Sequence, residues 1–223
     1  LKREARVWMS LEHLNIVPLL GLFSGELGPD FGLVSDELVP GLVSPWYSCG
    51  NILDYIQRPN VAREPLCEDV ARGLRYLHEQ DPPIIHGDLK GANVVVANDG
   101  RAALCDFGLS IIRDTPGFTS SAFGGTIRFM AQEQLSDDSG PRTLLSDVYA
   151  YACTYVQIMT GDPPFTWYKN FAPIVRAICE GESPYNMDSI TSHHNLEFLG
   201  PSWDPEPARR PSISDICRTL GVL

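Results

Sequence analysis

The chain has 223 residues, enough for one domain, and 43% of them are hydrophobic, enough to fill a sizeable core. Its 17 Lys and Arg residues against 28 Asp and Glu residues give a formal net charge of -11, which argues against nonspecific binding to nucleic acid or to an anionic membrane. No apolar run approaches the roughly 20 residues that a membrane span needs, and residues 1–4 lack the apolar stretch of a signal peptide. We therefore expect a folded domain in the cytoplasm, or alternatively the nucleus, with neither nucleic acid nor a membrane as a partner.

Six cysteines are scattered singly through the sequence, with no CxxC pair and no histidine partner that would complete a zinc site. Single thiols without such a framework fit a reducing compartment, and we interpret them as core thiols. They are Cys49, Cys67, Cys105, Cys153, Cys179 and Cys217. The pair His193-His194 has no third ligand at a suitable spacing, so we interpret it as part of a surface loop.

The first 46 residues predict a helix followed by a small group of strands. Apolar residues at helix-like spacing predict a helix from Leu1 to about Leu14. Its expected buried stripe consists of Leu1, Ala5, Trp8 and Leu11. Over residues 17–46 short apolar runs alternate with Gly, Pro and Asp, which predicts short antiparallel strands joined by turns.

The rest of the chain predicts mainly helices. Residues 66–79 place apolar side chains at helical intervals and Glu68 and Asp69 in the first turn, where the helix dipole favours acidic groups. Residues 146–160 are apolar on nearly every face, which predicts a buried central helix, and a capping box predicts a last helix after Ser212. The expected core residues are Val70, Leu74 and Leu77 of the first of these helices and Ile213, Ile216 and Leu220 of the last. The expected fold class is α+β, with a partial β-rich part before a mostly helical part.

A predicted hairpin brings two polar residues together. Residues 94–97 and 101–105 are strand-like, and the sequence Asn-Asp-Gly at residues 98–100 is typical of a tight turn between them. Because a hairpin returns its ends to the same place, we expect Asn93 before the first strand and Asp106 after the second to lie together. Carboxylate and amide oxygens suit Mg²⁺, which prefers hard oxygen ligands together with substrate phosphates.

Two more charged residues approach the same end of the hairpin. Asp88 and Lys90 lie just upstream of Asn93 and add one carboxylate and one cation. A metal that neutralises phosphates, a cation for the migrating group and a carboxylate that orients the attacking hydroxyl are what phosphoryl transfer requires. The alternative interpretation is a loop with ordinary capping acids.

Here the sequence resembles a known family. HGDLKGAN at residues 86–93 resembles the catalytic loop of protein kinases, and DFG at residues 106–108 resembles their metal-binding triplet. The resemblance covers essentially the whole chain, through GTIRFMAQE, SDVYAYACTYVQIMTGDPPF and WDPEPARRPS. Lys90 after Asp-Leu and Thr126 before Ala-Gln-Glu resemble the serine/threonine type of the tyrosine-kinase-like group.

The resemblance implies a protein-kinase-like fold across residues 1–223. Residues 1–47 would form a partial N-terminal lobe with the hinge, and residues 48–223 the complete helical C-terminal lobe. It implies ATP and Mg²⁺ as cofactors and protein substrates as partners, with transfer of the γ-phosphate of ATP to Ser or Thr hydroxyls.

The resemblance also implies a role for each site residue. Asp88 would be the catalytic base, Lys90 would contact the transferred phosphate, and Asn93 and Asp106 would hold Mg²⁺. Residues 44–47 would form the linker whose backbone binds adenine. The ATP-binding residues are thus expected to be Ser44, Trp46, Tyr47, Lys90, Asn93 and Asp106.

Further residues match structural positions of the family. Glu133 and Arg210 match a buried ion pair that anchors the activation segment, and Asp147 matches a helix residue that holds the catalytic-loop backbone. His86 is expected to be a packed core histidine beneath Phe107 rather than an acid or base.

The sequence departs from the family pattern at its start. No glycine-rich loop and no VAIK-like lysine precede Glu4. The family pattern would pair Glu4 with that lysine, and the alternative interpretation of Glu4 is a solvated helix residue. We therefore expect an N-terminally truncated domain with weak or undetectable transfer by the chain as printed. We also expect association through an exposed edge and apolar face of its partial lobe.

Two substitutions within the motifs also stand out. Gly87 replaces the arginine that normally meets a phosphate on the activation loop, so we expect activation without phosphorylation of that loop. The hydroxyl residues available there are Thr115, Thr119, Ser120 and Ser121. Gln132 replaces the proline of the Ala-Pro-Glu triplet and leaves Glu133 intact, which we regard as minor.

Two other classes of function stay open at this point. The first is a catalytically silent, kinase-like interaction module, against which the complete set of polar catalytic-loop residues argues. The second is a small-molecule phosphotransferase of the same fold, against which the motifs that organise protein-substrate binding argue.

Overall fold

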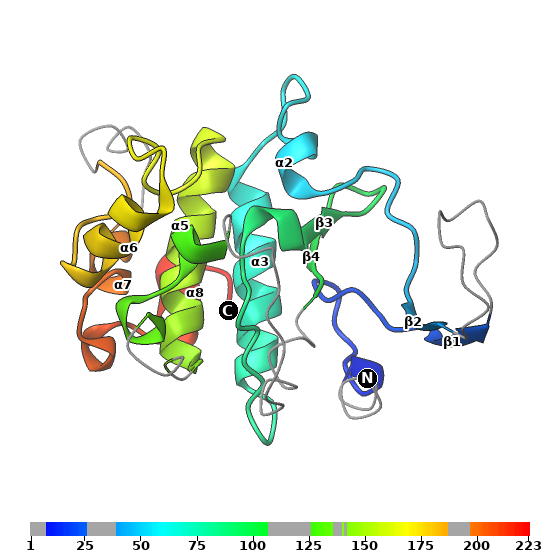
Figure 1. Cartoon of the computed structure of the whole chain (residues 1–223). Coiled ribbons are helices and arrows are strands. Elements are labelled where there is room, and N and C mark those ends of the chain that lie inside the picture. Colours follow the sequence, from blue (N-terminus) through cyan, green and yellow to red (C-terminus); the bar gives the residue numbers. More distant parts are fainter. Residues whose placement is uncertain (1–7, 26–38, 107–125, 136–139, 141, 187–196) are drawn as a thin grey trace.

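The computed structural model describes residues 8–25, 39–106, 126–135, 140, 142–186 and 197–223. These residues form a small β-sheet at one side and a larger helical part at the other, with a second hairpin between them (Figure 1). The arrangement confirms the expected α+β class. None of the described helices has the length and apolar character that crossing a bilayer requires.

The predicted first helix ends earlier than expected. Trp8 and Met9 are helical, but the chain turns at Ser10, so the predicted extension to Leu14 is wrong. The reason is a contact with a residue nine positions further along: the Trp8 indole donates a hydrogen bond to the Val17 carbonyl at 2.6 Å, which requires the chain to reverse between them. Trp8 is buried, as predicted.

The first sheet consists of two antiparallel strands, β1 (Gly21–Gly25) and β2 (Val39–Val43), as the alternation of apolar runs predicts. Leu20, Leu22 and Val43 remain 65%, 53% and 41% exposed around this sheet. Apolar surface of this kind favours association. That association stays a prediction.

The second hairpin carries the candidate site. Strands β3 (Val94–Val96) and β4 (Ala102–Leu104) pair antiparallel with Val94 opposite Leu104, which confirms the predicted hairpin. Gly100 in its turn has a φ of +86°, a conformation that a residue without Cβ adopts readily.

One buried asparagine fastens the N-terminal segment to this hairpin. The Asn15 side chain donates from Nδ2 to the Ala102 carbonyl at 2.9 Å, and its backbone carbonyl accepts from the Leu104 N–H at 2.9 Å. Asn15 thus continues the β3–β4 hydrogen-bonding pattern outward. The N-terminal segment is thereby held against the strand that leads to Asp106.

Three helices form the centre of the helical part and run side by side in Figure 1: α3 (Glu64–His78), α5 (Leu144–Thr160) and α8 (Ile213–Leu220). Helix α3 contacts both α5 and α8, and it also packs on β4. It begins two residues before the predicted start, so Glu64 lies in its first turn and the expected first-turn position of Glu68 and Asp69 is wrong. The Pro65 ring favours this earlier start because Pro suits the first helical turn.

Helix α5 is the predicted buried central helix. Fourteen of its residues are buried, and Thr143 caps its N-terminus by accepting from the Ser146 N–H. Its C-terminus ends at Gly161, which has the left-handed φ of +88°. Helix α8 has the predicted Ser212–Asp215 capping box, although Leu220 is only partly buried.

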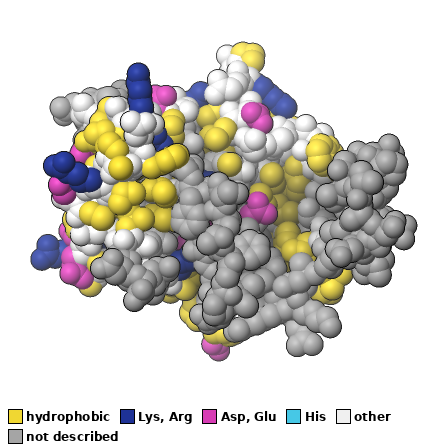
Figure 2. All heavy atoms as spheres, viewed as in Figure 1, with side chains coloured by type: hydrophobic (Ala, Val, Ile, Leu, Met, Phe, Trp, Pro, Cys, Tyr) yellow, Lys and Arg dark blue, Asp and Glu magenta, His cyan; other side chains and the backbone are white. Residues whose placement is uncertain are grey.

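Shorter elements complete the described fold. They are α2 (Ile52–Tyr55), α6 (Phe171–Cys179), α7 (Leu199–Ser202) and the 3-10 helices η2 (Gly91–Asn93), η4 (Ile127–Phe129), η5 (Gln132–Gln134) and η7 (Pro207–Arg209). Figure 2 shows a group of hydrophobic side chains on the surface of the helical side, where α6 lies. Trp167 and Phe171 of this region are 46% and 51% exposed.

The interpretation of the cysteines as core thiols holds for Cys67, Cys153 and Cys217, which are buried. Cys49 and Cys105 are partly buried, and all six thiols are free. For Cys179 the interpretation is wrong, because this residue is exposed at the end of α6. That helix turns Ile174, Ala177 and Ile178 inward, which leaves the next position on its solvent side.

We predict that Gly73→Ala destabilises the fold. A Cβ at Gly73 in α3 would lie 2.6 Å from the Asn15 backbone oxygen and 3.2 Å from Leu104 Cδ1. Alanine gains about 1 kcal/mol of helix propensity. The clash should outweigh this gain and lower the free energy of unfolding by roughly 1–3 kcal/mol in urea denaturation.

Gly200→Ala is the matched control, because Gly200 also lies in a helix and its added Cβ would have nothing within 4 Å. This substitution should leave stability unchanged or raise it. Equal effects of the two substitutions would contradict the packing argument.

Candidate functional site

The segment at residues 86–93 begins at a buried carboxylate. Asp147 of α5 accepts from the His86 N–H at 2.7 Å through Oδ2 and from the Gly87 N–H at 2.8 Å through Oδ1. This confirms the expected contact between Asp147 and the loop backbone. The φ of +73° at Gly87 lets the two successive N–H groups converge on one carboxylate.

A third group reaches the same carboxylate, and the sequence analysis did not find it. Nε2 of His78, in the last turn of α3, lies 3.0 Å from Asp147 Oδ2, with both side chains buried. The signal in the sequence is a histidine at the inner end of a helix that otherwise buries apolar residues. The contact joins α3, α5 and the start of the loop.

Asp88 lies at the centre of a cluster of polar side chains, which the sequence analysis expected to lie near one another. Its Oδ2 accepts from Lys90 Nζ at 2.8 Å and from Asn93 Nδ2 at 2.9 Å. Lys90 Nζ also donates to Thr126 Oγ1 at 2.8 Å, which joins the loop to the segment that leads into η4. The cluster therefore brings together three of the four predicted catalytic residues with Thr126.

The two Asp88 oxygens have different surroundings. Oδ1 is buried and has no hydrogen-bond partner within the described part of the chain. A buried carboxylate oxygen without a donor is unfavourable. Oδ1 is therefore available to accept a hydrogen bond from a group outside the described residues, such as a bound hydroxyl.

The orientation of Asn93 follows from its partners. Nδ2 donates to the Asp88 backbone carbonyl at 2.8 Å as well as to Oδ2. Because both acceptors belong to Asp88, the amide is turned so that Oδ1 of Asn93 faces away from that residue. An amide oxygen in this position can act as a ligand for a hard cation.

Asp106 lies at the open end of the hairpin, as predicted. The Cys105 N–H donates to the Asn93 carbonyl at 3.0 Å, so Asp106 follows directly at the same end as Asn93. It is exposed and has a φ of +59°, which aspartate tolerates better than most residues. Phe107 and Gly108 of the triplet lie outside the described residues, as do Glu4 and His193-His194.

Burial shifts the pKa values of two side chains near the cluster, His86 and Cys105. Burial lowers the pKa of His86 below its usual value, against the raising effect of Asp147 and Asp88, which favours the neutral ring. This fits the expected role of His86 as a packed core histidine. Burial, together with the Asp106 carboxylate, raises the pKa of Cys105 to about 12, so its thiol stays protonated at neutral pH.

A second contact with α5 was also missed by the sequence analysis. The Gly91 N–H, at the end of the loop, donates to Gln157 Oε1 at 3.0 Å. The available signal was one amide side chain in an otherwise apolar helix. Helix α5 thus contacts both ends of the catalytic-loop segment.

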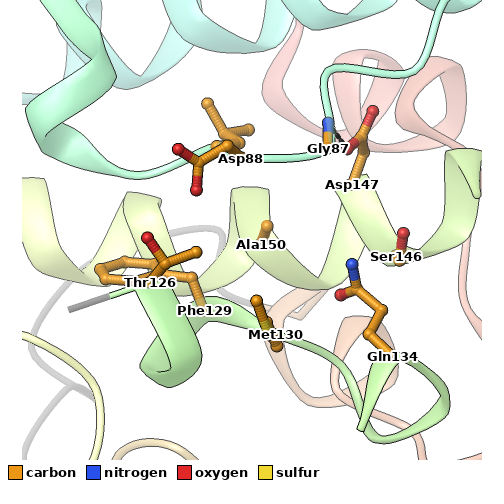
Figure 3. Close-up of a pocket in the computed structure, with 10 residues that line it drawn as sticks. Gly87, Asp88, Thr126, Phe129, Met130, Gln134, Ser146, Asp147 and Ala150 are labelled. Atoms are coloured by element: carbon orange, nitrogen blue, oxygen red, sulfur yellow. Dashed lines mark hydrogen bonds between the residues drawn. The ribbon is translucent and has the colours of Figure 1, made fainter. Parts of the chain in front are cut away.

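A small cavity lies beneath the cluster. Figure 3 shows it between the loop, with Gly87 and Asp88, and the residues Thr126, Phe129, Met130 and Gln134 on its other side. Its volume of about 10 Å³ is no more than one water molecule needs. It is therefore a packing gap and too small for a nucleotide.

These geometric features agree with the comparison to known families. Residues 1–220 match the Protein kinase domain family. The chain belongs to this family.

Named relatives are serine/threonine and dual-specificity kinases. Over 99% of its length the chain is 31% identical to serine/threonine-protein kinase CTR1 of Arabidopsis thaliana, of which it spans 26%. Over its whole length it is 28% identical to probable serine/threonine-protein kinase SIS8 of Arabidopsis thaliana, of which it spans 21%. It is 31% identical over 98% of its length to dual specificity protein kinase shkC of Dictyostelium discoideum, of which it spans 42%. The chain therefore covers less than half of each of these relatives.

Protein kinases use ATP and a divalent metal, generally Mg²⁺. The residues present fit such a metal: Asp106 offers an exposed carboxylate, and Asn93, whose Nδ2 is turned toward Asp88, lies at the same end of the hairpin with its amide oxygen directed away from Asp88. This pairing of hard oxygen donors beside Lys90 matches the chemistry of a metal–phosphate site.

The predicted adenine linker lies between β2 and α2. Ser44 is exposed, the Trp46 side chain is 91% exposed, and Tyr47 is partly buried, with its carbonyl accepting from the Gly50 N–H at 3.0 Å. The exposed indole agrees with a contribution from the backbone rather than from this side chain. The ATP contacts of Ser44, Trp46 and Tyr47 stay predictions.

The expected ion pair of the kinase family is present. Arg210 donates from both terminal nitrogens to the two Glu133 oxygens at 2.7 and 2.8 Å. The Arg210 side chain is fully buried, and it also donates to the Leu145 carbonyl at the start of α5. The pair thereby links η5 to the helix that holds the loop.

We predict that Glu133→Ala lowers the free energy of unfolding by about 3 kcal/mol, because it leaves the buried Arg210 guanidinium without its carboxylate. Thermal or urea denaturation measures the loss. Glu180→Ala is the control, since Glu180 and Arg176 form an exposed pair on one helix face, and no change is expected there. A Glu133→Ala variant as stable as the control would show that the pair contributes nothing.

Proposed function

We propose that the protein carrying this domain transfers the γ-phosphate of ATP to Ser or Thr hydroxyls of protein substrates. The observation that carries the proposal is the pair of Asp88 oxygens. Oδ2 is fixed by Lys90 and Asn93, while Oδ1 is buried without a donor among the described residues. A carboxylate held by one oxygen and open at the other is suited to orient an incoming hydroxyl.

In this proposal Asp88 accepts the hydrogen bond of the substrate hydroxyl through Oδ1. The contact points the hydroxyl oxygen toward the γ-phosphate and receives its proton as transfer proceeds. The two donors on Oδ2 keep the carboxylate from rotating. Positioning of this kind is the main protein contribution in phosphoryl transfer.

Lys90 supplies positive charge next to the base. Its Nζ donates to both Asp88 and Thr126, and in this proposal the ammonium stabilises the charge that develops on the transferred phosphoryl group. Asn93 and Asp106 would hold Mg²⁺, which when bound neutralises phosphate charge. The contact of Lys90 with Thr126 also joins the loop to the segment that leads into η4.

For ATP we propose the backbone of residues 44–47 as the adenine contact. Residues 1–47 then form the small lobe with the hinge, and residues 48–223 form the helical lobe. The loop, hairpin and linker would thus converge on the nucleotide from three separate elements.

We predict that Asp88→Asn lowers kcat by about 10²–10⁴-fold, because the amide keeps an oxygen for Lys90 but cannot take a proton. The measurement is transfer of labelled phosphate from ATP to a generic protein substrate, using the protein expressed from its natural transcript. Asp99→Asn in the exposed turn of the same hairpin is the control and should keep wild-type activity. Transfer by neither wild type nor variant would favour the silent interaction module instead.

We predict that loop phosphorylation is not needed for this activity. Residue 87 is glycine, so the arginine that in this family meets a loop phosphate does not precede Asp88 in this chain. Replacing Thr115, Thr119, Ser120 and Ser121 together by alanine should therefore leave the rate of transfer unchanged. Loss of activity in this quadruple variant, with normal folding by circular dichroism, would overturn the expectation.

A further inference from the structure

Gly91 is the residue at which the catalytic loop passes into η2. The first N–H groups of a helix have no partner within that helix, so a buried one needs an acceptor from elsewhere. For Gly91 the acceptor is Gln157 Oε1 at 3.0 Å. Both Gly91 and Gln157 are buried, so water does not replace this contact readily.

The local packing leaves no room for a side chain at Gly91. A Cβ there would lie 2.6 Å from Leu53 Cδ2 and 2.7 Å from Gln157 Oε1. The glycine thus allows the Gln157 amide to approach the backbone directly. Leu53 of α2 and Gln157 of α5 fill the space next to Gly91.

The loop is consequently held at both ends by one helix. Asp147 near the N-terminus of α5 holds His86 and Gly87, and Gln157 near its C-terminus holds Gly91. Asp88 and Lys90 lie between these two attachments. Since α5 is the buried central helix, both attachments have the same rigid base.

We propose that Gln157 is a positioning residue for phosphoryl transfer, acting through the Gly91 backbone on Lys90 and Asn93, which flank it closely in the chain. This inference rests on the proposed kinase activity. Asp147 fixes the start of the loop and β3 fixes the residues after Asn93, so the Gly91 contact is the attachment that holds the segment between them to α5. Gln157 sets the distance between the Lys90 ammonium and the Asn93 amide that meet on Asp88.

The amide chemistry of Gln157 suits this role better than a charge does. A buried carboxylate would also accept from Gly91, but it needs several donors to replace its hydration. It would also place a negative charge close to the site where phosphates bind. The neutral amide oxygen accepts one hydrogen bond without either effect.

The test compares Gln157→Leu, which keeps a similar volume but removes the acceptor, with wild type. We expect kcat to fall about ten- to a hundredfold, as for a displaced catalytic group, while the KM for ATP changes little. Gln157→Glu, which restores an acceptor, should recover part of kcat. Gln57→Leu is the matched control, because Gln57 is an exposed glutamine beside α2, and it should behave as wild type.

Hydrogen exchange of the Gly91 amide provides a readout that does not depend on activity. In Gln157→Leu this amide should exchange about tenfold faster or more, because its hydrogen bond is lost. A variant with normal kcat and normal Gly91 exchange would overturn the proposal. Inactive wild type with fast Gly91 exchange in the variant would instead refute the kinase function and retain the attachment. Faster exchange with unchanged kcat per folded molecule would show a purely structural contact.

Discussion

The position of the candidate site depends on one buried carboxylate. Asp147 has three neighbouring groups, the N–H groups of His86 and Gly87 and the His78 ring, and its side chain is only 1% exposed. A carboxylate taken out of water requires donors that replace its hydration. The loop must therefore lie where its two N–H groups reach Asp147, and Asp88, the next residue, takes its position from this constraint.

Helix α5 can anchor the loop because its own position is fixed by the rest of the fold. It is buried on nearly all sides, and α3 and α7 pack against it. Its N-terminal end is also tied to Arg210, which donates to Leu145 while it pairs with Glu133. Because protein interiors are close-packed, a shift of α5 would require these neighbours to move with it. The polar contacts of the loop therefore depend on the position of α5, and the packing of α5 against its neighbours fixes that position.

The sequence predicted well those features whose signals lie within a few neighbouring residues. The β3–β4 hairpin has its turn signal, and α5 and α8 have their periodicity and caps within a few residues. The features it missed depend on partners outside the element itself: the helix end at Ser10 follows from the contact of Trp8 with Val17, and the contact of Gln157 with Gly91 joins residues far apart in the chain. The roles of the site residues came from the family resemblance, and the geometry supplies the physical reason for their placement.

The carboxylate of Asp88 is satisfied differently from two charged and amide groups that hold the scaffold together. In the scaffold, charged and amide groups such as Arg210 and Asn15 bind partners of the chain itself. At Asp88 one oxygen has two donors, while the other is buried without one among the described residues. Folded proteins rarely leave buried acceptors unsatisfied, and one additional donor side chain would have removed the cost. An interaction module gains nothing from such an oxygen, whereas an enzyme that must receive a hydroxyl requires it, so this atom favours catalysis over a silent role.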